Sequence, residues 1–545
     1  MPRASSPSVV SGRPAVWSPG RVALWAVFAL GVVLRLPAFG RPLLSDDEAI
    51  YATTADAMMR GDRLYRDVVD HKPPLIYHVY QAGFAALGRY QMQGAHALVL
   101  LAVLVTAGLL WAAARQSTAT PGAGAGLAAA ALFLIFSTTW HDYDALAANC
   151  ELFLLAPQTA AAWLVLRDAR RTPRGRGVRA AVTHLAIGAL IGTSALFKYQ
   201  GLTFLGASVG MLAWSAWRGR TSWAAAAAGA ICQVAGAAVP PALYLLGCVA
   251  AGNAAATVYW FRFNFSYVGA GLTGMTALGR GLRRLASIGG VALVPYALGL
   301  AAGFTTAAGL RRAVRRRDGE GGPPPAMMLG LLWLVTSTVA LRAGGRFFGH
   351  YFHLILAPLC LLATPGFCRW WNAGRLARAV LVVACAVPAL AFFGLATVGR
   401  ALAARLDEGE PPYEDVAARI DALTTADERI FVWGNSPQLY ILARRPMGTR
   451  FSFCNYMTGE SPGTPTESGR WNADANQLAA SWEMLFADLE QRQPALLVDA
   501  AAAGWDGYDK FPLARYPRLR AYVDSHYRPV EEPAGVVLYR RLRTR

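Results

Sequence analysis

The sequence predicts an α-helical polytopic membrane protein with about eleven transmembrane helices, interfacial helices in the first outer loop and a C-terminal extracytoplasmic α/β domain. Of the 545 residues, 55% are hydrophobic and only 16% are charged, whereas soluble domains carry roughly 25% charged residues. Apolar stretches also recur along most of the chain, and about 20 residues of helix suffice to cross about 30 Å of hydrocarbon. This composition excludes an ordinary soluble protein.

The apolar stretches define the predicted spans. The first one follows Arg13 and Arg21, as a secretory signal would, but no small-residue cleavage site closes it and more spans follow, so we expect a retained anchor. The predicted spans lie at residues 22–39, 94–114, 123–140, 150–167, 181–197, 199–217, 223–250, 287–310, 326–342, 352–368 and 379–398.

The net charge of +19 would suggest nucleic acid in a soluble protein. Here, however, the arginines concentrate in alternate connections between the spans, as in residues 167–179 and 311–317. Cytoplasmic loops carry the excess of Lys and Arg in membrane proteins, so every second loop is predicted to be cytoplasmic. We therefore expect a cell (plasma or inner) membrane protein with a cytoplasmic N-terminus and no nucleic-acid partner.

Two regions on the predicted outer side are too long to be turns. One is the first outer loop, residues 40–93. The other is the C-terminal region, residues 400–545. In it, short apolar runs at 429–433, 495–498 and 536–539 predict strands that alternate with helical stretches. The predicted division is a cytoplasmic tail, a transmembrane domain and an extracytoplasmic α/β domain, at residues 1–21, 22–399 and 400–545.

The first outer loop opens with a helix-start signal. Residues 45–48 (SDDE) have the form of a capping box, in which the serine caps the helix and the glutamate bonds back to it. A helix is predicted to run to about Arg60, with Gly61 as its left-handed C-terminal cap. Asp46 and Asp47 then lie in the first turn. They either only complement the helix dipole, which contributes about 0.3–1 kcal/mol, or carry chemistry.

A lysine near the end of the same loop favours the second reading. Lys72 follows His71 and precedes two prolines, which push its backbone towards an extended conformation and so aim its ammonium group. Of the 52 basic residues, only Lys72, Lys198 and Lys510 are lysines. A compact ammonium suits a phosphate group. The alternative is a surface lysine at the level of the lipid headgroups.

These motifs resemble those of a known superfamily. Residues 43–80 (LLSDDEAIYATTADAMMRGDRLYRDVVDHKPPLIYHVY) resemble the first outer loop of the C-type membrane glycosyltransferases that use polyprenyl-phosphate sugars, the protein-mannosyltransferase and lipid A aminoarabinose-transferase superfamily. The resemblance implies that Asp47, paired with Glu48, is the catalytic base and that Lys72 contacts the donor phosphate.

Other positions of the superfamily pattern match less closely. The aminoarabinose branch has an arginine three residues after the aspartate and ahead of a tyrosine, whereas this chain has Ile50 before Tyr51, so we do not expect that sugar as the donor. Glu151 resembles the second acidic position. His350 and Tyr351 open the tenth predicted span much as the superfamily's His-Tyr pair does, although a histidine beside an aromatic residue is often structural.

Four further basic residues fall on the predicted outer face. Lys198 lies in the turn between the fifth and sixth predicted spans, where it would either reach a donor phosphate or extend to the membrane interface. Arg280, Arg283 and Arg284 lie outside against the charge bias, which predicts contact with an anionic lipid or the isoprenoid phosphate. Glu151 would orient the acceptor, help to hold a divalent cation, or merely face headgroups.

The resemblance implies an inverting glycosyltransferase that moves a sugar from a polyprenyl-phosphate donor to a hydroxyl of a lipid, glycan or protein acceptor at the outer face. No cysteine pair or ligand spacing predicts a metal site or a disulfide framework. The alternatives are an O-antigen ligase or polymerase, a secondary transporter, and a non-catalytic scaffold. A transporter would show paired halves and ionisable groups at mid-membrane, whereas the acids here gather at one face.

Overall fold

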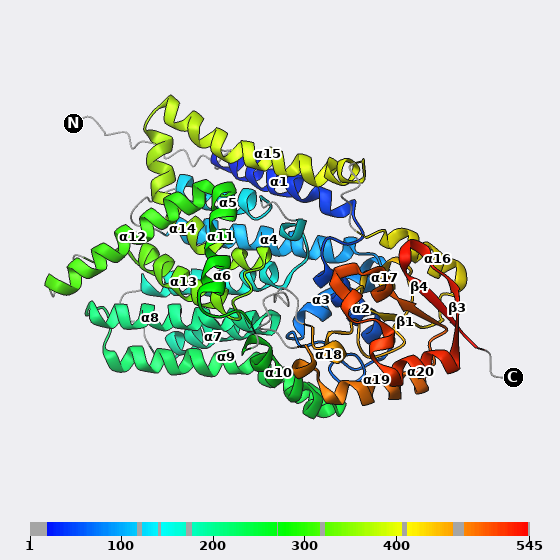
Figure 1. The fold of residues 1–545 in the computed structure, drawn as a ribbon. Coiled ribbons are helices and arrows are strands. Elements are labelled where there is room, and N and C mark those ends of the chain that lie inside the picture. The colour runs from blue at the N-terminus through cyan, green and yellow to red at the C-terminus, as the bar shows by residue number, and fades with distance from the viewer. Residues whose placement is uncertain are drawn as a thin grey trace, which may run out of the picture.

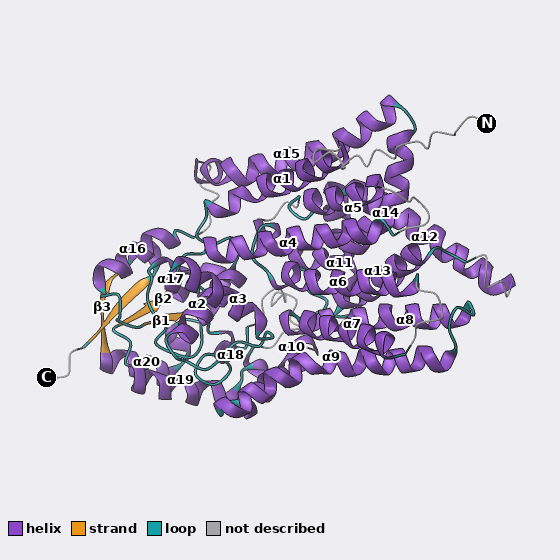
Figure 2. Cartoon of the chain, turned by 180° about the vertical axis from the view of Figure 1, so that it is seen from behind, coloured by secondary structure: helices purple, strands orange, loops and turns teal. Residues whose placement is uncertain are grey.

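The computed structural model describes residues 19–116, 123–139, 143–170, 177–269, 271–316, 322–405, 411–460 and 473–542. Long helices lie side by side in a bundle, and a smaller domain that contains all the strands labelled in the picture packs against one end of that bundle (Figure 1). Seen from behind, the sheet lies at the end of the molecule that also holds α2 and α3 (Figure 2). The fold class predicted from the sequence is confirmed.

Each predicted span coincides largely with a helix. The eleven helices are α1 (Pro19–Phe39), α4 (Gln93–Ala114), α5 (Ala123–Phe136), α6 (Cys150–Ala169), α7 (Val178–Phe197), α8 (Phe204–Trp217), α9 (Trp223–Ala251), α12 (Leu293–Arg316), α13 (Pro325–Arg342), α14 (His353–Asn372) and α15 (Arg375–Arg405). In the described part of the chain, eight helices have the length and hydropathy to cross a membrane alone. Of the other three, α5 and α8 have only 14 residues each, and α6 carries Glu151, Arg167 and Asp168 near its ends.

Two predicted spans contain an interruption in the structure. The range 287–310 crosses a break, because α11 (Gly274–Val291) ends at Ala292, whose backbone leaves the helical region, before α12 begins. The range 199–217 starts with a short 3-10 turn, Tyr199–Thr203, and becomes α-helical only at Phe204. Another helix, α10 (Ala254–Gly269), precedes α11 and was not predicted.

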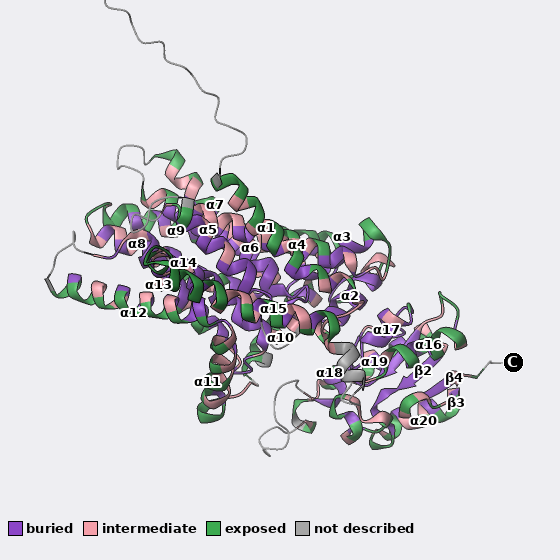
Figure 3. Ribbon diagram, turned by 90° about the horizontal axis from the view of Figure 1, so that it is seen from above, coloured by how far each residue is buried: buried purple, intermediate pink, exposed green. Residues whose placement is uncertain are grey.

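Buried residues concentrate in the middle of the bundle (Figure 3). Small residues let α7 and α9 approach closely: a Cβ on Gly188 would lie 2.1 Å from the Gln233 carbonyl oxygen, and one on Gly192 would lie 2.3 Å from that of Ala237. Such contacts are typical of helices that pack within a membrane, where tight van der Waals packing replaces the hydrophobic effect.

The first outer loop forms two helices, α2 (Asp46–Met59) and α3 (Leu75–Leu87). The Ser45 side chain caps α2 by accepting a hydrogen bond from the Glu48 amide at 3.3 Å, as predicted. Gly61 has a φ of +100°, which favours glycine just after the helix end.

The C-terminal domain has one mixed sheet with the strand order β1-β2-β4-β3. The three predicted strands are present, and a fourth, β3, was missed. The elements are α16 (Tyr413–Leu423), β1 (Ile430–Trp433), α17 (Gln438–Leu442), α18 (Asn455–Thr458), α19 (Ala479–Arg492), β2 (Leu496–Asp499), α20 (Pro517–His526), β3 (Tyr527–Glu531) and β4 (Val537–Arg541). Strands β1 and β2 are parallel, whereas β4 runs antiparallel to both of its neighbours.

Candidate active site

Asp47 and Lys72 meet although 25 residues separate them. The Lys72 ammonium donates hydrogen bonds to Asp47 Oδ1 at 2.6 Å and to the Tyr51 hydroxyl at 2.7 Å. The Tyr51 hydroxyl in turn donates to Asp47 Oδ2 at 3.2 Å. Because Asp47 and Tyr51 are one helical turn apart on α2, both face the ammonium. We call these three residues the base–lysine group, after the role that the resemblance implies for Asp47.

The backbone around Lys72 is fixed by its neighbours, as the two prolines predict. The Tyr65 hydroxyl donates to the Lys72 carbonyl at 2.7 Å, and the Asn264 side-chain amide from α10 donates to the His71 carbonyl. The Lys72 side chain is 14% exposed and also lies 4.5 Å from the centre of the Tyr51 ring. The ammonium is therefore held in one place rather than free in solvent.

The charges in this group reinforce each other. Burial alone raises the pKa of the Asp47 carboxyl, but Lys72, His350 and Lys198 outweigh burial and hold this pKa well below its usual range. Burial alone lowers the pKa of the Lys72 ammonium, but Asp47 and Asp70 outweigh it and raise that pKa. Both groups are consequently ionised at neutral pH.

A further acid, Asp144, was missed by the sequence analysis. It lies in a 3-10 turn, Tyr143–Ala145, and accepts hydrogen bonds from His350 Nδ1 and, at 2.7 Å, from the Asn149 amide. The other ring nitrogen of His350 lies 3.8 Å from Asp47 Oδ2. His350 therefore lies between two carboxylates. Burial by itself raises the pKa of Asp144, but the effect of the histidine is larger and lowers that pKa.

Glu151 and Lys198 form a second ion pair beside the first. Glu151 is in the first turn of α6 and is 1% exposed, whereas Lys198 follows the last residue of α7. The Lys198 ammonium lies 3.8 Å from the centre of the Tyr351 ring, and Glu151 Oε1 lies 3.9 Å from His350 Nε2. The predicted residues Glu151, Lys198, His350 and Tyr351 are thus brought together with Asp47.

Glu48 and Asp46 point to different partners from Asp47. The Glu48 carboxylate, which has no exposed surface, accepts hydrogen bonds from the Leu44 amide at 2.8 Å and the Ala148 amide at 2.6 Å, and it lies 3.1 Å from His96 Nε2. The predicted return bond to Ser45 is therefore replaced by one bond to the preceding residue, Leu44, and by contacts with two distant segments. Asp46 accepts a hydrogen bond from the Gln438 amide of α17 at 2.6 Å.

The C-terminal domain contacts the loop next to Lys72. The Val69 amide donates to the Arg450 carbonyl at 2.8 Å, and His71 Nδ1 lies 3.2 Å from the Tyr456 hydroxyl. Arg492 pairs with Asp62 at 3.2 Å. The domain therefore holds the segment that presents Lys72.

Arg280, Arg283 and Arg284 lie on α11, in the turns before its last residues. The Arg283 side chain is exposed, and the other two are half-buried. Their role as phosphate ligands stays a prediction. Among the described residues, no group of three or more His, Cys, Asp and Glu side chains is arranged to hold a metal ion.

No protein-family model and no curated protein matches the chain, but solved structures do. ArnT from Cupriavidus metallidurans bound to undecaprenyl phosphate matches with a TM-score of 0.59 at 17% identity, over 96% of this chain and 98% of that one. The Archaeoglobus fulgidus oligosaccharyltransferase in complex with zinc and sulfate matches with a TM-score of 0.56 at 14% identity, over 95% and 73%.

This chain has the fold of ArnT and of the archaeal oligosaccharyltransferase. A second structure of the latter, AglB with an inhibitory peptide and a dolichol-phosphate, matches with a TM-score of 0.53 at 14% identity, over 96% of this chain and 74% of that one. The ArnT likeness covers both the bundle and the C-terminal domain. The fold expected from the resemblance in the first outer loop is confirmed.

Proposed function

We propose that this protein is a glycosyltransferase that moves a sugar from a polyprenyl-phosphate donor to an acceptor hydroxyl. The observation that carries the proposal is the contact of 2.6 Å between Asp47 and Lys72. It joins a carboxylate and an ammonium in the loop that resembles the donor-binding loop of C-type glycosyltransferases. The proposal also draws on structures of the same fold that hold undecaprenyl phosphate and dolichol-phosphate.

In the proposed reaction the acceptor oxygen attacks the anomeric carbon while the bond to the phosphate oxygen breaks. Asp47 takes the proton from the acceptor hydroxyl, and Lys72 stabilises the negative charge on the departing phosphate. A single displacement inverts the anomeric centre. One partner of the ion pair, Asp47, therefore accepts the proton, and the other, Lys72, stabilises the leaving group.

Donor binding would activate the base. In the ion pair the ammonium lowers the basicity of Asp47. A phosphate that attracts Lys72 weakens this effect, so the pKa of Asp47 rises towards a value suited to proton transfer. The enzyme would then gain its base only when the donor is present.

The second ion pair would serve the acceptor side. We propose that Lys198, with Glu151 and the Asp144–His350 pair, orients the reacting oxygens and balances the charge beside Asp47. Glu48 would position α2 rather than touch the substrates, because its carboxylate is turned to Leu44, Ala148 and His96.

We further propose that the first outer loop and the C-terminal domain face away from the cytoplasm in a cell membrane, with the N-terminus inside. The support is the alternation of arginine-rich connections. Single cysteines at Arg66 and Ser525 in a cysteine-free background should react with an impermeant maleimide in intact cells. A cysteine at Arg312, at the far end of α12, should react only after lysis. The reverse pattern would overturn the orientation.

The test of the proposed activity is a donor panel. Purified protein is incubated with radiolabelled polyprenyl-phosphate sugars and a lipid extract from the source membrane as acceptor. Transfer from at least one lipid-phosphate donor is expected. UDP- and GDP-sugars in detergent, without polyprenyl phosphate, should give none. Transfer from a nucleotide sugar under these conditions, or substrate transport into vesicles with no transfer from any lipid donor, would contradict the proposal.

A further inference from the structure

A second charged site lies at the opposite end of α6 from the candidate active site. A cavity of about 770 Å³ is lined by the ends of α6, α7, α8, α9 and α13. Glu151 and Asp168 are 17 positions apart on α6, so the two sites are separated by about 25 Å along that helix. This end also holds the arginine-rich connections, and by the proposed topology it faces the cytoplasm.

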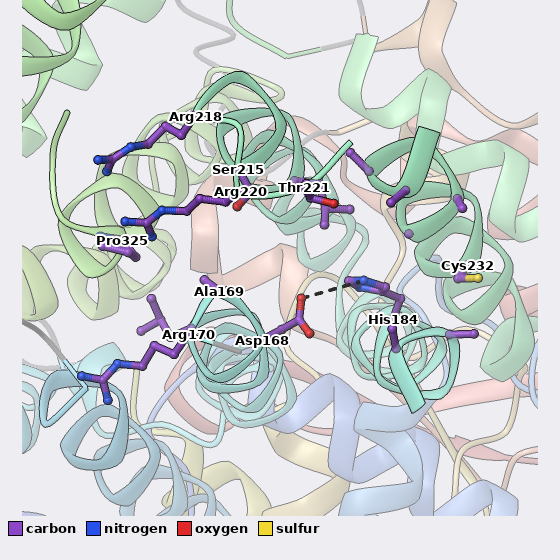
Figure 4. Close-up of a pocket in the computed structure, with 18 of the residues that line it drawn as sticks. Asp168, Ala169, Arg170, His184, Ser215, Arg218, Arg220, Thr221, Cys232 and Pro325 are labelled. Carbon is purple, nitrogen blue, oxygen red and sulfur yellow. Dashed lines mark ion pairs between the residues drawn. The ribbon is translucent and has the colours of Figure 1, made fainter. Parts of the chain in front are cut away.

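Three arginines line the cavity: Arg170 just after α6, and Arg218 and Arg220 in the turn between α8 and α9. Figure 4 shows their guanidinium groups extending on the same side of the cavity, from two different connections. The acid and the histidine of the lining, Asp168 and His184, lie on the other side and approach each other at 3.9 Å. The arginine side of the cavity therefore gathers three guanidinium groups.

The remaining wall is small and apolar. Ala180, Ala181, Ala225 and Ala228 line it on α7 and α9. Close to them, Val178 and Trp223 are 81% and 62% exposed, and large apolar side chains on the outside of a spanning helix face the acyl chains of the bilayer. The cavity therefore combines a cationic side with an opening beside a lipid-facing surface.

We propose that this cavity binds the phosphate group of an anionic lipid. Guanidinium groups bind phosphate oxygens through paired, charge-assisted hydrogen bonds. Basic pockets between membrane helices on the cytoplasmic side suit anionic headgroups. The starts of α7 and α9 also border the cavity, and the positive ends of helix dipoles add to the attraction. The apolar wall favours a lipid over a soluble phosphate, because acyl chains can lie along α7 and α9.

This site goes beyond the proposed activity and is independent of it. Nothing in the proposed reaction uses Arg170, Arg218 or Arg220, and the base–lysine group is at the other end of the bundle. A failure of lipid binding here would leave the glycosyl transfer untouched. Conversely, an inactive enzyme could still bind lipid at this site.

The test compares two triple substitutions that remove the same charge from the same end of the bundle. One replaces Arg170, Arg218 and Arg220 with alanine. The control replaces Arg311, Arg312 and Arg315, which lie on α12 and do not line the cavity. Delipidated protein is titrated with short-chain phosphatidylglycerol, with phosphatidylcholine of the same chain length, and with inorganic phosphate, and binding is followed by native mass spectrometry and by the thermal shift.

Wild-type protein should bind phosphatidylglycerol saturably and bind phosphatidylcholine far more weakly. The cavity variant should lose at least about tenfold in affinity for phosphatidylglycerol, and the α12 control less than about twofold. An equal loss in both variants would show general surface attraction and overturn the proposal. Inorganic phosphate that displaces phosphatidylglycerol at equal concentration would also overturn it, because the ligand would then be a soluble phosphate.

A second variant tests the cavity without removing any charge. Ala225→Phe fills part of the apolar wall, whereas Ala224→Phe changes the exposed neighbour that does not line the cavity. Phosphatidylglycerol affinity should fall in the first variant and stay within about twofold of wild type in the second. Unchanged binding in Ala225→Phe, in protein that melts like wild type, would overturn the proposed place of the lipid.

Discussion

The two ends of α6 hold opposite kinds of charged site. At one end each cation is matched by an acid: Lys72 by Asp47, and Lys198 by Glu151. At the other end three arginines line one side of a cavity, and Asp168 and His184 line the opposite side. A phosphate that enters the first site has to compete with the carboxylates that hold each lysine, whereas one that enters the second meets three guanidinium groups on one side of a cavity.

This difference indicates different tasks. Buried ion pairs are costly to form and costly to break, because either partner left alone remains a desolvated charge. A site built from them responds strongly when one partner is drawn away, which suits a reaction triggered by its donor. A half-exposed arginine cluster gains less from each contact and is screened by salt. It suits the retention of a lipid.

The largest expected effect comes from Lys72→Ala. It removes the cation of the base–lysine group, so donor affinity should fall and turnover should drop roughly a hundredfold or more. Loss of the ammonium also raises the pKa of Asp47, so the acid limb of the residual activity should move to higher pH. Lys510→Ala, which removes the lysine of the C-terminal domain, is the matched control and should cost less than about twofold. Wild-type transfer in Lys72→Ala would break the comparison.

Glu48→Ala should act on stability rather than on chemistry alone. It leaves the half-buried amide of Leu44, the buried amide of Ala148 and the buried His96 ring without their acceptor, which costs about 3 kcal/mol. The melting temperature in detergent, read from tryptophan fluorescence, should fall well below that of Asp47→Asn. A variant that melts like wild type and yet transfers no sugar would show that Glu48 takes part in the chemistry.

Salt should separate the two sites next. Raising the ionic strength from 0.1 to 1 M shortens the Debye length from about 10 to about 3 Å. Phosphatidylglycerol affinity at the arginine cavity should weaken about tenfold. Salt also acts on the donor itself, so the quantity to compare is the donor affinity of wild type divided by that of Lys72→Ala. This ratio should change less than about twofold because Lys72 is largely buried. If salt weakened phosphatidylglycerol affinity and this donor-affinity ratio equally, the two sites would not differ in their exposure to screening.

The smallest effect is expected from Tyr456→Phe. It deletes the hydroxyl that lies 3.2 Å from His71 Nδ1 but leaves the ring in place. One hydrogen bond contributes about 1 kcal/mol, so turnover should fall about fivefold with the melting temperature nearly unchanged. Tyr522→Phe, elsewhere in the C-terminal domain, should leave turnover within about twofold. A hundredfold loss in Tyr456→Phe would mean that the domain does more than position the loop.

Local patterns predicted most of the helices and marked two residues of the candidate site. Hydropathy identified the spans because each must cover the same thickness of hydrocarbon. The capping motif and the two prolines marked Asp47 and Lys72, since both signals act within a few residues. Their contact itself depends on how the loop folds back, which no local pattern contains.

The residues that sequence reasoning missed depend on distant contacts. Asp144 lies in a three-residue turn without a spacing rule, and only its bond to His350 shows its place. Glu48 fitted a capping box, but its carboxylate contacts His96, 48 positions away, and accepts a hydrogen bond from the Ala148 amide, 100 positions away. Arg218 and Arg220 were indistinguishable from the arginines of the other loops predicted to be cytoplasmic until helix packing placed both beside one cavity.

The most direct test of the central claim compares Asp47→Asn with Asp46→Asn. The two acids are neighbours of equal charge, but Asp47 meets Lys72 and Asp46 meets Gln438. With one lipid-phosphate donor, Asp47→Asn should lose roughly a hundredfold or more in turnover. Donor binding should stay at least as tight as in wild type, because the phosphate no longer competes with this carboxylate for Lys72, and the melting temperature should stay above that of Glu48→Ala. Asp46→Asn should retain most of its activity. Near-wild-type turnover in Asp47→Asn, or a larger defect in Asp46→Asn, would contradict the assignment of Asp47 as the base.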